Sequence, residues 1–201
     1  MEIKSLKISS KNKNAHKKMA QIIRSGGIAV TPTDTVYGLV ADAFNMQAQR
    51  KIYFLKGRKY KKPLIIMAHN IDSVRMLASI SDDAYKIVKR FWPGQLTLIL
   101  PTNDIGKIIS GGRTDIGVRI PNHSFMLKFL KEFGKPVWTT SANISNTKSA
   151  KTFEETLIFE NKVDVLIDGG KCKCSFESTI IDAVKYPFTV LRKGALDVKK
   201  I

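Results

Sequence analysis

The sequence predicts an α/β protein, in which helices flank a mixed, twisted sheet within a single domain. Apolar residues at helical spacing and short apolar or alternating runs intermix along all 201 residues. Strict alternation of strand and helix is lost after residue 95, which favours a mixed sheet over a purely parallel one. No repeat or low-complexity linker divides the chain, and its length suits one substantial core. We therefore expect one domain over residues 1–201, with its core at about 15–195.

The predicted helices carry apolar residues three and four positions apart. Ala15, Met19 and Ile23 form such a stripe, and the glycines at 26–27 are typical of a helix end. Ser81 precedes two acidic residues, which predicts an N-cap and a first turn that suits the helix dipole. Helices are expected at 14–25, 47–57, 71–80, 81–91, 123–133 and 152–160.

The predicted strands are short, apolar and bounded by turn residues. Pro32 suits the end of a strand, because proline cannot donate a hydrogen bond to the ladder. Residues 34–44 are predicted to be a loop that leaves the first strand, and WPG at 92–94 breaks the chain. Strands are expected at 28–33, 63–68, 95–101, 117–121, 136–142, 163–170, 177–183 and 188–194.

The chain is strongly basic. It has 34 Lys and Arg against 17 Asp and Glu, which gives a formal net charge of +17. Such a positive field attracts nucleic acid, nucleotides or an acidic partner. The alternative is that lysine serves as a general solvent-exposed residue, which gives the same net charge. No apolar run approaches the roughly 20 residues that span a bilayer, and the first residues lack a signal-type apolar region. We expect a cytoplasmic protein without a membrane partner.

Several common catalytic patterns are missing. The sequence has no G-x-x-x-x-G-K-[ST], G-x-G-x-x-G or G-x-S-x-G, and His16, His69 and His123 form no H-x-x-x-H or H-E-x-x-H pair. Metal-dependent hydrolysis and triad chemistry are therefore disfavoured. Cys172 and Cys174 form a lone C-x-C without the second ligand pair of a structural zinc site. We expect two incidental thiols, with redox or metal chemistry as the alternative.

Small polar residues gather where predicted strands begin or end. They occur in TPTDT (31–35), TTSAN (139–143) and EST (177–179). Ligands of open α/β sheets bind in crevices outside strand ends, and Ser, Thr and Asn can hydrogen-bond a polar ligand there. The alternative is ordinary turn and capping chemistry.

Cations lie beside these polar groups. Arg119 and Arg192 fall within predicted strands, where a guanidinium is costly unless it pairs with a carboxylate or faces a ligand. A structural salt bridge is the alternative for each arginine. The segment KGRKYKKPL (56–64) is also crowded with positive charge between a helix and a strand. Its cations are Lys56, Arg58, Lys59, Lys61 and Lys62. Together these features predict a site for phosphate and carboxylate, with this segment as a phosphate-gripping loop.

Seven stretches of the chain resemble the YrdC/Sua5 family, the threonylcarbamoyl-AMP synthases, and they come in the family's order. They are PTDTVYGL (32–39), KGR…KKPLIIM (56–67), WPGQLTLIL (92–100), GVRIPNH (117–123), TSANIS (140–145), the IDGG–ESTIID region (167–182) and VLRKG (190–194). The length resembles that of the short, single-domain members. The resemblance implies a YrdC-like mixed sheet around a basic central cavity.

The resemblance also implies an activity. Family members are nucleotidyltransferases that join L-threonine, bicarbonate and ATP, with Mg2+, into L-threonylcarbamoyl-adenylate and pyrophosphate. Other proteins then transfer the threonylcarbamoyl group to adenosine 37 of tRNAs that read ANN codons. Expected partners are thus the three substrates, the downstream transferase proteins, and RNA as tRNA or a double-stranded segment.

Residue roles carry over by position. The residues implied for L-threonine are Thr35, Arg119, Ser141 and Ser178. Those implied for the nucleotide are Lys56, Arg58, Lys62, Asn143, Ser149 and Arg192, and Lys56 and Arg58 are also implied in catalysis on the triphosphate. No protein ligand is implied for the metal, because Mg2+ would sit on the phosphates.

The sequence departs from the family pattern at several positions, including Lys59 where the loop commonly has proline. Lys62 stands where the loop commonly has asparagine, Met67 where it has histidine, and Asp115 where threonine is frequent. Three rival interpretations remain. One is a non-enzymatic RNA-binding module, another is a paralogue of this fold with a different acyl- or carbamoyl-adenylate chemistry, and the third is a structural protein with an inactive site.

Overall fold

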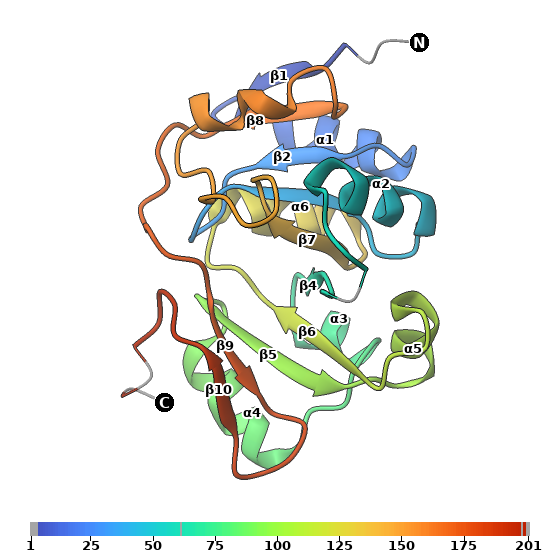
Figure 1. Cartoon of the computed structure of the whole chain (residues 1–201), viewed down its shortest axis with the longest axis vertical. Coiled ribbons are helices and arrows are strands. Elements are labelled where there is room, and N and C mark those ends of the chain that lie inside the picture. The colour runs from blue at the N-terminus through green and yellow to red at the C-terminus, as the bar shows by residue number, and fades with distance from the viewer. Residues whose placement is uncertain (1–3, 61, 198, 200–201) are drawn as a thin grey trace.

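One sheet runs through the computed structural model, which describes residues 4–60, 62–197 and 199 (Figure 1). Its strands are β1 (Leu6–Ser9), β2 (Ala29–Thr31), β3 (Gly38–Asp42), β4 (Ile65–Met67), β5 (Leu96–Pro101), β6 (Asp115–Arg119), β7 (Val137–Ser141), β8 (Val165–Asp168), β9 (Thr179–Asp182) and β10 (Thr189–Arg192). Their order is β1-β8-β2-β3-β7-β4-β6-β5-β9-β10. The pairs β1–β8, β2–β8, β4–β6 and β5–β9 are parallel and the others are antiparallel. The mixed sheet predicted from the sequence is confirmed.

The helices are α1 (Ala15–Arg24), α2 (Met46–Lys56), α3 (Ile71–Arg75), α4 (Asp82–Phe91), α5 (Asp104–Ser110), α6 (Ser124–Phe133) and the 3-10 helix η1 (Glu154–Phe159). The predicted cap of α4 is present, because the Ser81 hydroxyl oxygen accepts a hydrogen bond from the backbone N–H of Ala84 at 3.3 Å. The chain leaves α1 through Gly26, whose φ of 81° favours glycine. No helix among the described residues has the length and apolar character that crossing a membrane requires.

Three predictions of local structure were wrong or incomplete, and two elements were missed. Residues 34–44 are not all loop, because they contain β3, a central strand that is buried on both faces and therefore lacks alternation. The edge strand β1 and the helix α5 were not predicted. The helix expected at 71–80 stops after Arg75, because Ala78 bridges to Thr102. The helix at 152–160 is a 3-10 helix.

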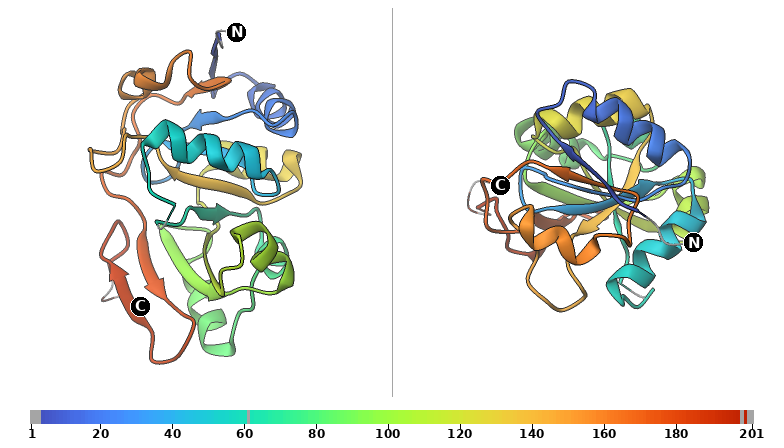
Figure 2. Two further views of the ribbon diagram at one scale, coloured as in Figure 1. Left: turned by 45° about the vertical axis from the view of Figure 1, so that its right-hand side comes forward. Right: turned by 90° about the horizontal axis from the view of Figure 1, so that it is seen from above.

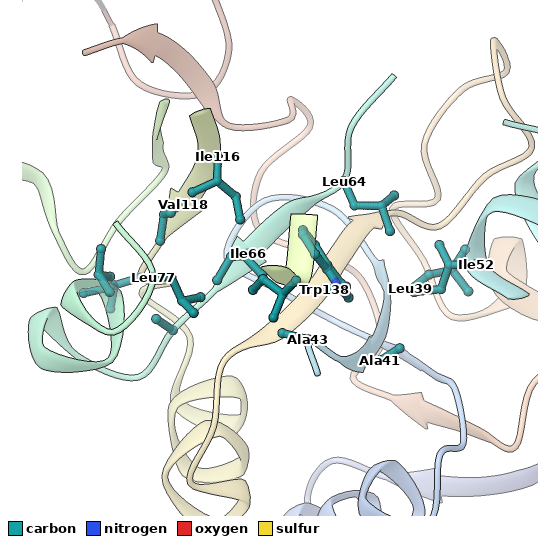
Figure 3. Close-up of a cluster of buried hydrophobic side chains, with 14 of the residues drawn as sticks. Leu39, Ala41, Ala43, Ile52, Leu64, Ile66, Leu77, Ile116, Val118 and Trp138 are labelled. Carbon is teal, nitrogen blue, oxygen red and sulfur yellow. The ribbon is translucent and has the colours of Figure 1, made fainter. Parts of the chain in front are cut away.

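Helices cover both faces of the sheet, but α1 and α6 cover only part of the face on which they lie. They pack together on one side, as Figure 2 shows, over Val40, Met67 and Val137. On the other face Ile66 and Trp138 join the larger core, with Ile52 of α2 (Figure 3). Side chains alternate along each strand, so a residue two positions from one that α1 and α6 cover lies on the same face of the sheet. Such residues lie beyond the two helices and are not covered by them. A site can form on that uncovered area.

Candidate functional site

The uncovered area forms the floor of a cavity of about 790 Å³. Ile65, Ile99 and Thr139 line it from β4, β5 and β7, and Met67 lines it at the border with the area that α1 and α6 cover. Seven of the ten residues predicted for the site also line it: Thr35, Arg58, Lys62, Arg119, Ser141, Ser178 and Arg192. The predicted basic central cavity is therefore present. A second cavity, of about 830 Å³, adjoins the first and shares Pro63, Ile65, Ile99 and Leu191 with it.

Arg119 is held firmly at the end of β6, although only 2% of it is exposed. Its Nε donates to the carbonyl oxygen of Gly94 at 3.0 Å, and one terminal nitrogen donates to the Thr35 hydroxyl oxygen at 2.9 Å. The other terminal nitrogen pairs with the Asp34 carboxylate. Burial lowers the pKa of Arg119, and the charge of Asp34 opposes that shift. The salt-bridge alternative is correct for this residue, yet its guanidinium has N–H groups beyond these three bonds, and Arg119 lines the cavity.

The loop after β2 is fixed by its own polar side chains. The Thr33 hydroxyl oxygen accepts from the backbone N–H of Thr35 at 3.1 Å and lies 3.0 Å from the Thr35 hydroxyl oxygen. The Asp34 carboxylate also accepts from the backbone N–H of Asn122 at 3.1 Å, and Gln95 donates to the Asp34 carbonyl oxygen at 2.7 Å. This network joins the loop to the segments that flank β5 and β6, so Thr35 and Arg119 are positioned together.

A second cluster lies where β9 begins. The hydroxyl oxygens of Ser178 and Thr97 are 2.8 Å apart, and a terminal nitrogen of Arg192 donates to the Ser178 hydroxyl oxygen at 3.2 Å. Arg192 also pairs with the Glu177 carboxylate, which accepts from the Ser149 hydroxyl at 2.6 Å. The salt-bridge alternative is thus correct for Arg192 as well. Glu177 was not predicted, although an acidic residue beside Ser178 in so basic a chain was a usable signal.

Lys56 lies behind the cavity wall and not in it. Only 1% of this residue is exposed, and its ammonium donates to the carbonyl oxygens of Ser141 and Asn143 and to the Asn143 side-chain oxygen. The bond to the Asn143 carbonyl oxygen measures 2.8 Å. Burial lowers the pKa of Lys56 to about 8, and the nearby charge of Arg58 adds to the shift. All three N–H groups of the ammonium are used within the protein, which differs from the direct phosphate contact expected of it.

Asn143 and Ser149 also lie outside the cavity lining. The Asn143 amide donates to the carbonyl oxygens of Ile144 and Thr147, both at 2.8 Å, and its oxygen accepts from the Ser141 hydroxyl at 2.7 Å. These bonds shape the turn after β7. Asn143 and Lys56 therefore present Ser141 to the cavity, and Ser149 acts through Glu177.

The basic segment after α2 folds around Arg58. The Arg58 Nε donates to the carbonyl oxygen of Lys62 at 2.9 Å, and a terminal nitrogen donates to that of Pro63 at 3.0 Å. Burial lowers the pKa of Arg58. Among the described residues no carboxylate pairs with Arg58 or with Lys62, whose ammonium is 3.5 Å from the Asn146 side-chain oxygen. Lys61, part of the predicted phosphate loop, lies outside the described residues.

The structure also locates Met67 and Asp115, which depart from the family pattern, and the two cysteines. Met67 contributes to the cavity floor, and Asp115 pairs with Arg113 at 2.8 Å in the second cavity. Cys172 and Cys174 are free thiols. In the described part of the chain, no three His, Cys, Asp or Glu side chains gather as metal ligands would.

Comparison with known proteins shows a family relationship over most of the chain. A family model named for Sua5, YciO and YrdC, and described as "Telomere recombination", matches residues 21–194. The threonylcarbamoyl-AMP synthase of Pyrococcus abyssi is 38% identical over 185 residues, which are 90% of this chain and 54% of that protein. The enzyme of the same name from Bacillus subtilis is 33% identical, with 90% and 54% covered. This chain thus spans about half the length of those relatives. A relative from Methanocaldococcus jannaschii is 36% identical, with 98% and 96% covered.

Solved structures show the same fold. The crystal structure of P. abyssi Sua5 complexed with L-threonine matches with a TM-score of 0.91 and 35% identity, covering 97% of this chain and 58% of that one. Escherichia coli YciO, at 23% identity, supports the fold alone, with a TM-score of 0.87 over 98% of this chain and 97% of that one. The order of motifs, the cavity and the matched family model lead to one conclusion: the chain belongs to the Sua5/YciO/YrdC family.

Proposed function

We propose that this protein is an L-threonylcarbamoyl-adenylate synthase, which uses L-threonine, bicarbonate and ATP and releases pyrophosphate. The observation that carries the proposal is the joint position of Thr35, Arg119 and Ser178 in one cavity with Arg58, a cation with no salt bridge among the described residues. The names of the P. abyssi and B. subtilis relatives, and L-threonine bound in the P. abyssi structure, support the same activity.

The threonine end of the cavity would be the Arg119 side. A guanidinium held at several nitrogens is preorganised for a carboxylate, because little side-chain freedom is lost on binding. The hydroxyl groups of Thr35, Ser141 and Ser178 can exchange hydrogen bonds with the amine and hydroxyl of the amino acid. Asp34 pairs with Arg119 and holds its guanidinium in place.

The triphosphate end would be the loop after α2. Arg58 and Lys62 line the cavity there, and their positive charge suits the phosphate oxygens. Among the described cavity residues the one carboxylate is Glu177, which is already paired with Arg192. This donor set fits Mg2+ carried on the phosphates, where it would neutralise charge that develops on the leaving group.

The chemistry needs positioning more than a protein nucleophile. The threonine amine would add to CO2 derived from bicarbonate and lose a proton, which gives a carbamate. A carbamate oxygen would then bond to the α-phosphorus while the bond from that phosphorus to the bridging oxygen of pyrophosphate breaks. Arg58 and Lys62 would stabilise the negative charge on the departing pyrophosphate. A recessed site would also limit hydrolysis of the labile carbamate.

The product would be consumed by other proteins. A threonylcarbamoyl-adenylate is an activated acyl donor, so a transferase that modifies adenosine 37 of ANN-reading tRNAs is the expected acceptor system. The net charge of +17 would favour contact with that RNA, and such work would take place in the cytoplasm.

Threonine-dependent pyrophosphate release tests the proposal. Purified protein is incubated with ATP, Mg2+ and bicarbonate, with and without L-threonine, and with L-serine as the comparison amino acid. We expect release that requires threonine and is far weaker with serine. ATP binding without threonine-dependent release would favour a paralogue with another acceptor. Binding of RNA that weakens steeply with salt, without ATP binding, would favour the RNA-binding module.

A further inference from the structure

The arginines that line the cavity differ in how their charges are balanced. Arg119 pairs with Asp34, and Arg192 pairs with Glu177. Arg58 makes its hydrogen bonds to backbone carbonyl oxygens, and no carboxylate among the described residues pairs with it. Two of the three guanidinium groups are therefore neutralised before any ligand enters.

Glu177 holds two groups expected on the nucleotide side of the site. Its carboxylate accepts from the Ser149 hydroxyl at 2.6 Å and forms the ion pair with Arg192. Burial raises the pKa of this carboxyl, but the Ser149 hydrogen bond, the charge of Arg192, the Ser141 hydroxyl and the charge of Lys56 together hold the pKa below its usual range. Glu177 is thus ionised at neutral pH.

We propose that Glu177 determines which way a nucleotide lies in the cavity: it cancels the charge of Arg192, so the polyphosphate goes to Arg58 and Lys62. The inference rests on the proposed function, because it concerns the orientation of ATP. It makes Glu177 a specificity-determining residue that acts through Arg192.

The physical basis is the repulsion between like charges at short range. A phosphate near Arg192 would also lie near the Glu177 carboxylate, and in a partly buried site that repulsion is only weakly screened. Neutral parts of a nucleotide meet no such repulsion. Hydroxyl groups can donate to the carboxylate, and ring or sugar acceptors can receive N–H groups from Arg192. The nucleoside therefore suits this end and the phosphates suit the other.

Inorganic pyrophosphate is a suitable probe, because it has charge but no nucleoside. Its affinity is measured by calorimetry for the wild type and Glu177→Gln. The amide keeps hydrogen-bonding capacity toward Ser149 and Arg192 but loses the negative charge. We expect Glu177→Gln to bind pyrophosphate about tenfold more tightly, through a new site at Arg192. The gain should vanish in Glu177→Gln/Arg192→Met and persist in Glu177→Gln/Arg58→Met.

Glu160→Gln is the matched control. Glu160 pairs with Lys7 at 2.6 Å, and its side chain is 37% exposed against 33% for Glu177, but it does not line the cavity. Its replacement should leave pyrophosphate affinity unchanged. An equal gain there, or an affinity in Glu177→Gln that is unchanged or weaker, would overturn the inference.

Turnover gives a second readout. In Glu177→Gln, nonproductive binding of ATP should lower kcat and KM together, whereas a residue needed only for folding would not lower KM. The binding comparison also separates the two proposals. If the wild type releases pyrophosphate only with threonine, but Glu177→Gln does not bind pyrophosphate more tightly, the inference about Glu177 is wrong and the proposed function stands. If Glu177→Gln binds pyrophosphate more tightly, but the wild type releases no pyrophosphate with threonine, the proposed function is wrong and the effect of Glu177 on phosphate binding stands.

Discussion

Arg119 and Thr35 lie 84 positions apart in the chain, yet the guanidinium donates to the threonine hydroxyl oxygen at 2.9 Å. The bond joins the end of β6 to the loop after β2 and fixes two predicted ligand contacts relative to each other. Because Asp34 pairs with the same guanidinium, the geometry of this end of the cavity depends on a buried ion pair.

Loss of that ion pair should be costly. Arg119→Ala would leave the Asp34 carboxylate buried without its cation, so we expect the free energy of unfolding to fall by about 3–5 kcal/mol. Urea denaturation measures this loss. Asp34→Asn combined with Arg119→Met should recover part of it, because neither charge then remains buried. A loss below about 1 kcal/mol in Arg119→Ala would show that the pair is not buried as described.

Lys56→Met separates positioning from direct phosphate contact. The substitution keeps the apolar length of the side chain but removes the three hydrogen bonds to Ser141 and Asn143. We expect threonine-dependent turnover to be lost, because the turn after β7 loosens, while pyrophosphate affinity falls much less than in Arg58→Met. Calorimetry and the release assay measure the two effects. Equal losses of pyrophosphate affinity would mean that Lys56 itself contacts phosphate.

Tyr37 connects the start of β3 to the turn after β8. Its hydroxyl donates to the carbonyl oxygen of Gly170 at 2.8 Å and accepts from the backbone N–H of Gly169 at 3.0 Å. Tyr37→Phe leaves both groups without this partner, so we expect a loss of about 1–3 kcal/mol in the free energy of unfolding. Tyr60→Phe, at a residue that is 65% exposed, should have little effect in the same measurement. Equal stability of the two variants would contradict the prediction.

His123 should make α6 sensitive to acid. Its Nδ1 accepts a hydrogen bond from the backbone N–H of Met126 at 3.4 Å, as an N-cap does. Burial lowers the pKa of His123, and the charges of Arg119 and Lys173 oppose that of Asp34 around it. Since the folded-state pKa is below 6.5, the stabilisation is complete above pH 6.5 and is lost as the pH falls below that value.

His123→Asn tests this assignment, because asparagine caps a helix without titrating. Thermal unfolding is compared at pH 7.5 and pH 5.5. The wild type should lose more stability over this interval than the variant, by an amount up to about 1 kcal/mol, the typical value of a cap. Identical pH profiles for the two proteins would rule out His123 as the titrating cap.

Local patterns were sufficient for some elements and insufficient for others. The stripe at Ala15, Met19 and Ile23 predicted α1, and Ser81 predicted the cap of α4, because spacing and capping act within a few residues. The strand β3 was missed because a strand buried on both faces has no alternation to detect. Its burial depends on β2 and β7, which no local pattern around residues 38–42 reveals.

The sequence by itself determined the class of fold, the basic character of the site and, through its ordered motifs, seven of the residues that line the cavity. Residue type and short-range spacing carry that information. Only the tertiary structure decided that Lys56 lies behind the wall, that Asp34 and Glu177 pair with Arg119 and Arg192, and that Arg58 has no salt bridge among the described residues. Charge balance in a buried site depends on which side chains meet across the sheet, and those partners lie far apart in the chain.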